Sequence, residues 1–341
     1  MIVLYILIAI LVFGFLIFIH ELGHFMFAKK FGVSISEFSI GMGPKLLSKT
    51  GKDGVNYAIR ALPIGGYVAM VGEDEDSDDP NSFNKKPAWQ RFIIVIAGAI
   101  MNLLVGIIIM TVLTITTQEF GGTTVAGFFP TSTSNQKLMI GDKIVEIDGQ
   151  NVHTANDLNY EIMRNGYKPV RVTVIRNGNE IELDDVEFPQ VSSQGIAFGS
   201  IDFAIYGEEK TFGVVIKNAF YSCTSTVKMI WDSLYDLVSG RYGIEAVSGP
   251  IGVTGAITDA ARTSTYSLFY LVVVISMNLG IFNLLPIPAL DGGTLVFLLI
   301  EMIFRKPVPK KIENALKFAS FALLMLLVIV VTFNDILGLF K

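Results

Sequence analysis

Cysteine is nearly absent from this sequence, since Cys223 is the only one in 341 residues. One cysteine excludes an internal disulfide and a metal site made of cysteine thiolates. Histidine is also scarce, with three residues. Basic residues do not outnumber acidic ones: 26 lysines and arginines against 31 aspartates and glutamates give a net charge of −5. A net negative charge argues against nucleic acid as the main partner.

Charged residues of any kind are few as well, at 17% of the chain, whereas 51% of the residues are hydrophobic. The mean hydropathy is +0.54. These values exclude an ordinary soluble protein and favour several membrane spans combined with a soluble insert. We expect the first span from Ile2 to about Ala28. It lacks the basic start and the small-residue cleavage site of a signal peptide, so we expect it to be retained.

Two of the three histidines fall in one stretch, residues 19–24, at the end of this apolar run. On a helix, His20 and His24 lie one turn apart on the same face, so both can bind one metal ion. Glu21 lies beside them, placed to act as a base toward metal-bound water. Such a motif can arise by chance. In a bilayer-length segment, however, a charged group costs at least ~2.5–3.5 kcal/mol, which favours a functional role.

A catalytic zinc ion takes three protein ligands and keeps one position for water. The third histidine, His153, lies in a polar segment typical of a soluble domain and is a poor candidate for the third ligand. Asp291 is the best candidate, because it ends another apolar run. Two histidines and one carboxylate form a hydrolytic zinc set.

Three further apolar segments predict spans, at about residues 92–115, 267–285 and 315–333. Lysine and arginine are concentrated in residues 29–91 and 305–317, which places both segments on the cytoplasmic side. The sequence therefore predicts a multi-pass protein of the plasma or inner membrane. Both termini and the long insert are then outside the cytoplasm, and the metal motif lies toward the cytoplasmic side.

Residues 33–72 alternate apolar and polar side chains around a turn at Gly51–Gly54. The pattern predicts a β-hairpin or small sheet at the membrane face. Irregular backbone at membrane depth is tolerated only beside protein or a water-filled cavity, so a plain cytoplasmic hairpin is the alternative. The acidic run at residues 73–79 predicts a solvated loop without a site.

The polar insert contains strand patterns with turns at Asp148-Gly149 and Asn177-Gly178, and a helical pattern over residues 154–165. These indicate a small α/β module. The stretch Gly141–Gly149 resembles part of a PDZ domain, a module that binds an extended peptide or a C-terminus along a sheet edge.

A β-rich linker follows at residues 191–209, and then an amphipathic helix at about 212–237. This helix either lies on the outer membrane face or gates the entrance to the site, or it packs against the soluble domain. Residues 248–264 are expected to be a chain break followed by a polar stretch.

Polar residues and prolines mark two of the later spans. Asn102 follows Gly98 by one turn in the second span, where it either bonds a neighbouring helix or contributes to a site. Pro286 and Pro288 end the regular helix of the third span. They leave backbone groups unpaired, which suits a site that binds an extended peptide.

The sequence thus predicts an α-helical membrane protein with about four transmembrane helices, a membrane-associated β-hairpin and one extracytoplasmic PDZ-like α/β domain. The expected domains are a membrane core at 1–117, the PDZ-like domain at 118–190, a linker with the amphipathic helix at 191–265, and a second part of the membrane core at 266–341.

Five motifs, in this order along nearly the whole chain, resemble the bacterial site-2 protease family of intramembrane zinc metalloproteases. They are His20-Glu-Leu-Gly-His24, Gly65-Gly-Tyr-Val68, Gly98-Ala-Ile-Met-Asn102, Ser248-Gly-Pro-Ile-Gly252 and Asn283-Leu-Leu-Pro-Ile-Pro-Ala-Leu-Asp291-Gly292. The resemblance implies cleavage of membrane-anchored proteins, such as anti-sigma factors, remnant signal peptides or pheromone precursors, within their transmembrane segments.

The resemblance also implies roles for individual residues. It implies Zn2+ bound by His20, His24 and Asp291, with Glu21 as the base. The residues that it implies to contact substrate are Asn102, Gly65, Gly66, Tyr67, Asn278, Asn283, Pro286 and Pro288. Two departures are visible: the chain has room for one PDZ domain rather than two, and Ala99 stands where the family usually has proline.

Two other functions compete with this interpretation. One is a catalytically inactive scaffold that gathers partners through the PDZ-like domain, against which an intact Glu21 beside a full ligand set argues. The other is an ion or proton transporter that uses the same charged residues as a relay. A transporter would need no stoichiometric zinc and would give the insert no role.

Overall fold

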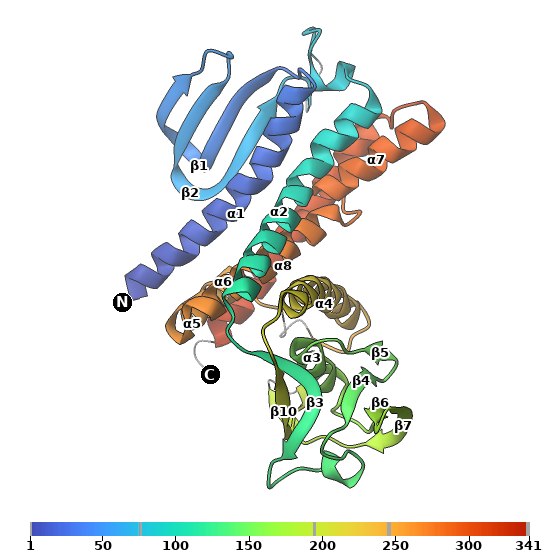
Figure 1. Ribbon diagram of the computed structural model, residues 1–341. Helices are drawn as coiled ribbons and strands as arrows, with labels where there is room; N and C mark the ends of the chain where they lie inside the picture. Colours follow the sequence, from blue (N-terminus) through green and yellow to red (C-terminus); the bar gives the residue numbers. More distant parts are fainter. Residues whose placement is uncertain (1, 74, 76, 194–195, 244–246, 339–341) are drawn as a thin grey trace. The chain divides into compact units, whose positions relative to one another are not determined.

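The structure is a computed structural model and describes residues 2–73, 75, 77–193, 196–243 and 247–338 (Figure 1). Four of its helices are long and apolar enough to cross a membrane, which confirms the predicted number of spans. These are α1 (Ile2–Lys30), α2 (Ala88–Thr116), α6 (Thr265–Leu284) and α8 (Lys310–Gly338). The chain forms two units, residues 1–109 with 247–341 and residues 110–246, each described in turn.

Helices α1 and α2 approach each other closely in the first unit. A Cβ atom on Gly23 of α1 would lie 2.5 Å from the carbonyl oxygen of Ala97 on α2. Glycine at position 23 therefore permits backbone-to-backbone contact, as small residues commonly do between membrane helices. The contact lies one residue from His24, so it brings α2 to the predicted metal motif.

The predicted hairpin is present as the antiparallel strands β1 (Ile35–Thr50) and β2 (Asn56–Met70), which lie along α1 (Figure 1). One part of the hairpin packs with α1, α2 and the later helix α7 in a core that includes Phe38, Val68 and Ile94. Between residues 42 and 62 the hairpin exposes large apolar side chains: Met42, Leu46, Leu47, Ile59 and Leu62. Between the hairpin and α2, the predicted acidic loop includes residues 74 and 76, which lie outside the described residues.

The third predicted span is followed by a break and then by α7 (Asp291–Phe304). Two glycines make the packing at this break possible. A Cβ on Gly292 would overlap the carbonyl oxygen of Leu285, and one on Gly293 would lie 2.5 Å from the carbonyl oxygen of Ile287. The Asp-Gly-Gly sequence therefore lets the first turn of α7 fold back against the end of α6 and fixes Asp291 there.

The structure corrects one expectation, because residues 250–263 are a helix, α5 (Pro250–Thr263), rather than an irregular polar stretch. Asp335 of α8 accepts hydrogen bonds from the backbone N–H groups of Gly249 and Gly252, at 3.2 and 2.9 Å. These are donors at the helix N-terminus that otherwise lack an intrahelical partner. A distant carboxylate therefore supplies the cap.

The second unit is an α/β domain whose sheet has the strand order β10-β3-β4-β6-β7, with β5 paired to β4. Its strands are β3 (Phe120–Phe128), β4 (Lys143–Ile147), β5 (Gln150–Asn151), β6 (Val170–Arg176), β7 (Asn179–Val186) and β10 (Phe203–Glu208). A hairpin of β8 (Gln190–Ser193) and β9 (Ile196–Gly199) precedes β10, and residues 194–195 and 244–246 of the predicted linker lie outside the described residues. Because β10 pairs with β3, this sheet continues beyond residue 190, where we expected the module to end.

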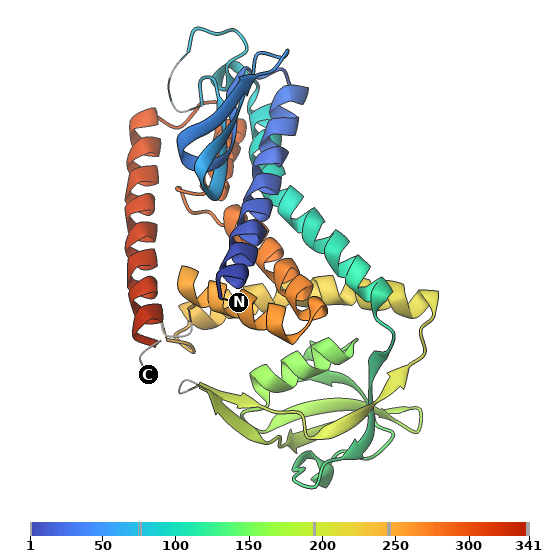
Figure 2. The ribbon, with the colours of Figure 1, turned by 90° about the vertical axis from the view of Figure 1, so that its left-hand side faces the viewer.

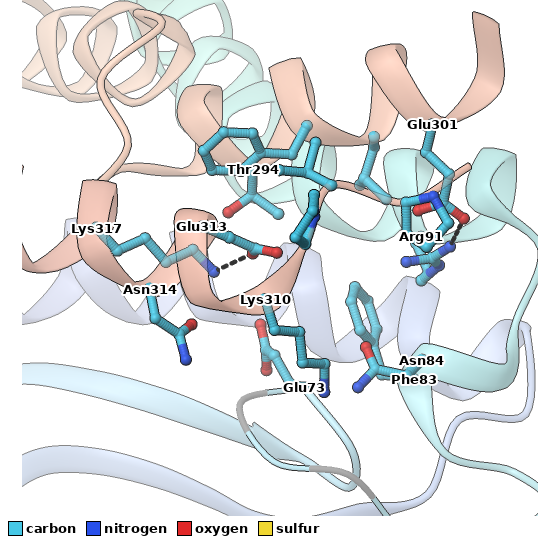
Figure 3. Close-up of a pocket in the computed structure, with 15 residues that line it drawn as sticks. Glu73, Phe83, Asn84, Arg91, Thr294, Glu301, Lys310, Glu313, Asn314 and Lys317 are labelled. Atoms are coloured by element: carbon cyan, nitrogen blue, oxygen red, sulfur yellow. Dashed lines mark hydrogen bonds and ion pairs between the residues drawn. The ribbon is translucent and has the colours of Figure 1, made fainter. Parts of the chain in front are cut away.

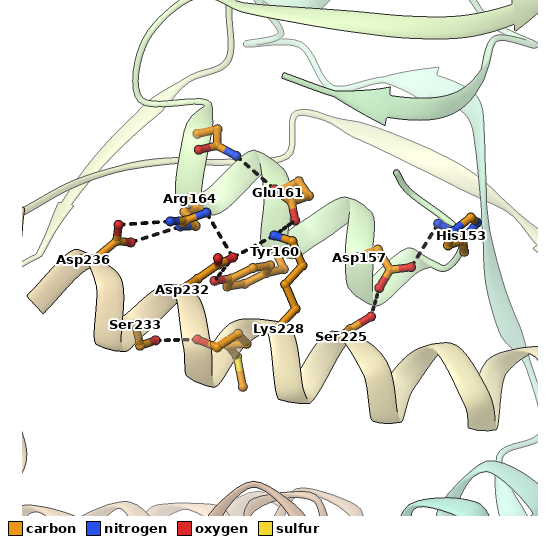
Figure 4. Close-up of polar contacts among 12 residues, drawn as sticks. His153, Asp157, Tyr160, Glu161, Arg164, Ser225, Lys228, Asp232, Ser233 and Asp236 are labelled. Carbon is orange, nitrogen blue, oxygen red and sulfur yellow. Dashed lines mark hydrogen bonds and ion pairs between the residues drawn. The ribbon is translucent and has the colours of Figure 1, made fainter. Parts of the chain in front are cut away.

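Helix α3 (Ala155–Asn165) of this unit carries a second helix, α4 (Phe212–Val238), on its outer side (Figure 4). Arg164 of α3 forms two 3.0 Å hydrogen bonds with Asp236 of α4, and Lys228 of α4 pairs with Glu161 at 2.7 Å. The polar face of the amphipathic helix therefore packs against the soluble domain, one of the expected alternatives. Its other face exposes the apolar residues Phe212, Ile216, Phe220, Trp231, Tyr235 and Val238.

Candidate metal centre

The imidazoles of His20 and His24 meet on one face of α1, as their spacing predicts. Their Nε2 atoms are 3.2 Å apart, and both residues are buried. His24 Nδ1 lies 2.9 Å from the carbonyl oxygen of Ile94 on α2, so Nδ1 is the nitrogen that carries the proton. The Nε2 lone pair of His24 is then free to bind a metal ion.

Asp291, at the first turn of α7, completes a group of three. Its Oδ2 atom lies 3.1 Å from His20 Nε2 and 3.3 Å from His24 Nε2. In the part of the chain that the structure describes, no hydrogen-bond donor is paired with this buried oxygen. The lone pairs of three acceptor atoms this close together repel one another, and a bound cation would relieve that repulsion.

The spacing of these three atoms fits zinc. Ligand atoms at about 2.0–2.1 Å from a tetrahedral zinc ion are roughly 3.3 Å from one another. The three measured separations are 3.1, 3.2 and 3.3 Å. Two imidazoles and one carboxylate are also ligands of the type that catalytic zinc sites use, and three ligands leave one position open.

Gly98 of α2 provides the room for both imidazoles. A Cβ atom at this position would lie 2.8 Å from His20 Cε1 and closer still to His24 Nε2. Every residue other than glycine would therefore displace the two rings. From the sequence, Gly98 was recognised as the first residue of the motif that ends at Asn102.

Glu21 follows His20 in α1 and faces the β-hairpin. Its Cγ atom lies 3.5 Å from the position that a Cβ on Gly66 would occupy. The hairpin residues therefore lie directly beside the predicted base. Gly65 adopts a φ of +87°, which favours glycine, and its Cα hydrogens lie against the side chain of Met42.

Tyr67 is positioned differently from the two glycines before it. Its hydroxyl donates to Glu37 Oε1 at 2.7 Å and also contacts Arg60 Nη2. Glu37 further accepts from Arg60 and pairs with Lys45 at 2.5 Å. The phenol hydroxyl is thus part of an ionic network within the hairpin. Tyr67 would therefore contact a substrate through its backbone.

Of the residues expected near the substrate at the end of the third span, Pro288 lines a hollow together with a ligand candidate. The hollow has a volume of about 380 Å³, and its lining includes Asp291, Thr294 and Lys317. Pro286 is exposed in the break between α6 and α7. Asn278 is half-buried, and its Oδ1 has no hydrogen-bond partner among the described residues.

The same expectation covered Asn283, which lies in the last turn of α6 and is half-buried. Among the described residues, no hydrogen bond connects its side chain with the three ligand candidates. The structure therefore brings His20, Glu21, His24, Asp291 and Gly66 together, and it places Asn278 and Asn283 along α6.

A second, polar hollow of about 340 Å³ adjoins the first and shares Thr294 and Lys317 with it (Figure 3). Charged pairs line it: Arg91 bonds Glu301, and Lys317 pairs with Glu313 at 2.7 Å. Because they share lining residues, the two hollows lie next to each other, and one of them includes Asp291. Sequence reasoning missed this feature, because its walls come from four separate segments.

The fold and the site together define a class of protein, namely membrane metallohydrolases that carry their ligands on apolar helices. Comparison with known proteins gives the family. The model of peptidase family M50 matches residues 8–327. The chain therefore belongs to peptidase family M50, the site-2 protease family, as its motifs indicated.

Individual relatives match over almost their whole length. A protein of Clostridium acetobutylicum provisionally named a zinc metalloprotease is 40% identical over 342 residues, which cover 97% of each chain. The Bacillus subtilis protein named "Regulator of sigma-W protease RasP" is 30% identical, with 97% of this chain and 98% of the relative covered. The latter alignment runs over 417 residues, against 341 in this chain, so the relative contains additional residues.

Proposed function

We propose that this M50 peptidase is an intramembrane zinc metalloprotease that hydrolyses peptide bonds within transmembrane segments of membrane-anchored proteins. The observation that carries the proposal is the cluster of His20, His24 and Asp291, whose facing atoms lie within 3.3 Å of one another on a membrane-length helix and its neighbour. In this proposal the three residues hold the zinc ion, and Glu21 is the catalytic base.

Bound zinc would supply two effects, a pKa of ~7 for a bound water and polarisation of the scissile carbonyl. Glu21 takes one proton from the attacking water as the oxygen bonds to the carbonyl carbon. The protonated Glu21 then delivers that proton to the amide nitrogen as the carbon–nitrogen bond breaks. One carboxyl group and one amine result, and Glu21 returns to its starting state.

A transmembrane helix hides its carbonyl groups in internal hydrogen bonds, so the substrate must be locally unwound. Gly66 of β2 lies beside Glu21, and a strand can pair with an extended peptide through backbone hydrogen bonds. The exposed apolar side chains of the hairpin, such as Leu46 and Leu47, support contact with lipid or with an apolar substrate. We propose that the unwound segment binds along β2, next to the break between α6 and α7.

Hydrolysis also needs water at a site among apolar helices. We propose that water reaches Asp291 from the α7–α8 loop through the two hollows that share Thr294 and Lys317. Lysine and arginine near this loop support a position on the cytoplasmic side under the positive-inside rule. The active site then opens toward the cytoplasm, whereas both termini and the inserted domain are outside.

The inserted domain is proposed to be PDZ-like, with its strand order and helix α3 in support. Such a domain binds an extended peptide or a C-terminus beside a strand. The apolar face of α4 suits the surface of the outer leaflet. Peptide binding is tested with the full chain and a fluorescent peptide library, and a lack of any saturable binding would remove this part of the proposal.

The name of the Bacillus subtilis relative connects that protein with the regulation of sigma-W. In agreement with that name, we propose membrane-anchored regulators of sigma factors as substrates of this chain, together with remnant signal peptides. The two rival functions lose support for a specific reason. A scaffold has no use for Glu21 beside a complete ligand set, and a transporter has no use for a carboxylate and two imidazoles at tetrahedral ligand spacing.

The experiment that tests the function is a cleavage assay with Glu21→Gln. The purified chain is reconstituted in liposomes with single-span substrates whose outer domains are reduced to a few residues, and the products are sized by mass spectrometry. We expect wild type to cut inside the apolar segment. The variant should bind zinc normally and lose at least 10²-fold in rate, the usual share of a general base. Undiminished cleavage by Glu21→Gln contradicts the mechanism.

A further inference from the structure

Asn102 has surroundings that a role in substrate binding does not explain. Its side chain on α2 is fully buried, and its Nδ2 atom lies 3.3 Å from His20 Nδ1. The other end, Oδ1, is buried without a hydrogen-bond partner in the described residues. The hydroxyl of Ser276 on α6 donates to the Asn102 backbone oxygen at 2.8 Å and fixes the residue from a second helix.

The chemistry of His20 decides which end of this amide it needs. A ring nitrogen that binds a metal ion gives up its lone pair, so the other ring nitrogen carries the proton. His20 directs Nε2 toward His24 and Asp291, which makes Nδ1 the donor. A donor requires an acceptor. The oxygen and nitrogen of a carboxamide are nearly equal in size, so a half-turn places Oδ1 at His20 Nδ1.

Helix α2 then supports both histidines from one face. Ile94, Gly98 and Asn102 are spaced four residues apart, one turn each. The Ile94 carbonyl accepts from His24 Nδ1, Gly98 leaves space for both rings, and the Asn102 amide faces His20 Nδ1. Each imidazole therefore has one partner on α2, on either side of the glycine.

We propose that Asn102 is a positioning residue that holds His20 in the Nδ1-protonated form, with Nε2 directed at the metal. This inference rests on the proposed zinc centre. It replaces the expectation that Asn102 contacts substrate. Outer partners of this kind typically change metal affinity by about 10- to 100-fold when they are removed.

The test measures zinc affinity of the detergent-purified full chain by competition with a chelator. We expect Asn102→Leu to weaken zinc binding by about 10- to 100-fold. Asn102→Asp keeps an acceptor of the same length and should bind zinc close to wild type. Thr114→Val is the matched control, because Thr114 is also buried on α2 and its hydroxyl donates to the Met110 carbonyl, away from the histidines. This control should leave zinc affinity unchanged.

A second readout covers the case in which Asn102→Leu does not fold. The chain has three histidines, so 15N-labelled imidazoles give a simple NMR spectrum with His153 as an internal reference. In zinc-loaded wild type we expect His20 Nδ1 to carry a proton, and Asn102→Asp to change the shift of His20 more than that of His24.

Two results would overturn the inference: a folded Asn102→Leu with wild-type zinc affinity, or a zinc-loaded wild type with His20 Nδ1 unprotonated. Both leave the proposed protease intact. Failure of the protease is seen separately, as wild-type protein that binds no zinc or cleaves no substrate.

Discussion

His20 and His24 reach one point because two glycines let α1 and α2 come together. Gly23 permits contact with the Ala97 carbonyl, and Gly98 leaves the space that the rings occupy. In the neighbouring hairpin, Glu37 is a residue whose protonation state can be tested.

Glu37 lies in the hairpin with Tyr67, Arg60 and Lys45 as partners. Burial alone would raise its pKa, but hydrogen bonds from Lys45, Tyr67 and Arg60 outweigh burial and lower the pKa from 4.5 to about 2. A carboxyl group with a lowered pKa stabilises the fold above its unfolded-state pKa and loses that contribution as pH falls through the folded-state value. Its stabilising effect is therefore complete above about pH 4.5 and fades toward pH 2.

We therefore expect Glu37→Gln to lower the Tm more at pH 7 than at pH 3. Circular dichroism melts of the detergent-solubilised chain at the two pH values measure this difference. Glu180→Gln, at an exposed position of β7, serves as the control and should change neither Tm. An equal loss at both pH values for Glu37→Gln would show that the network does not depend on the charge.

The sequence alone predicted the residues whose chemistry is local. His20, Glu21 and His24 form one helical motif, and Asp291 follows an apolar run, so both could be identified without a structure. The contacts of Asn102 and Gly98 with the imidazoles could not, because they depend on how α1 and α2 cross. A polar residue in an apolar helix predicts that a partner exists, but not which one.

Helices α3 and α4 pack against each other through charged side chains. Arg164 bonds Asp236 twice and also approaches Asp232 at 3.0 Å, and Asp232 accepts from Lys228 at 2.7 Å (Figure 4). Arg164 and Asp236 are largely buried. Removal of the arginine leaves carboxylates with too few partners, which is costlier than the loss of an exposed pair.

We expect Arg164→Met to destabilise the α3–α4 packing by about 2 kcal/mol, which corresponds to roughly 30-fold faster amide exchange. Hydrogen exchange of the full chain, read by mass spectrometry in residues 155–165 and 212–238, measures it. Arg171→Met is the matched control, since Arg171 pairs with an exposed aspartate at 2.8 Å and should change exchange little. Unchanged protection of α4 in Arg164→Met would mean that its apolar residues hold it in place.

Helices and strands were predicted correctly where the hydrophobic pattern extends over many residues. The prediction failed for a helix that is capped by a residue far away in the sequence. The four spans, the hairpin and α4 lie close to the expected ranges. Helix α5 was missed because Gly249, Pro250 and Gly252 give the pattern of a break. Its N-terminus is capped by Asp335, more than eighty residues away, and a local pattern carries no information about such a cap.

At the scale of the whole molecule, the proposed function depends on which side of the membrane each segment lies. The concentration of lysines and arginines in residues 29–91 and 305–317 supports our proposal that the hairpin and the α7–α8 loop face the cytoplasm and that the inserted domain lies outside. Figure 2 shows, from a second side, the strands β1 and β2 of the hairpin beside α1 within the first unit.

Single cysteines test this arrangement. In a Cys223→Ser background, Glu180→Cys in the inserted domain should react with a membrane-impermeant maleimide on intact cells. Lys52→Cys in the hairpin turn should react only after the membrane is permeabilised. Both positions are exposed, so access through the protein does not limit the reaction. The opposite pattern would reverse the topology.

The most direct measurement is the zinc content of purified wild type beside Asp291→Ala, with Asp335→Ala as a matched carboxylate variant at the other end of the membrane core. We predict about one zinc ion per chain in wild type and in Asp335→Ala, and a greatly reduced content in Asp291→Ala after dialysis against a weak chelator. A well-folded wild type without zinc, or an Asp291→Ala variant that retains the wild-type content, would contradict the proposed metal centre.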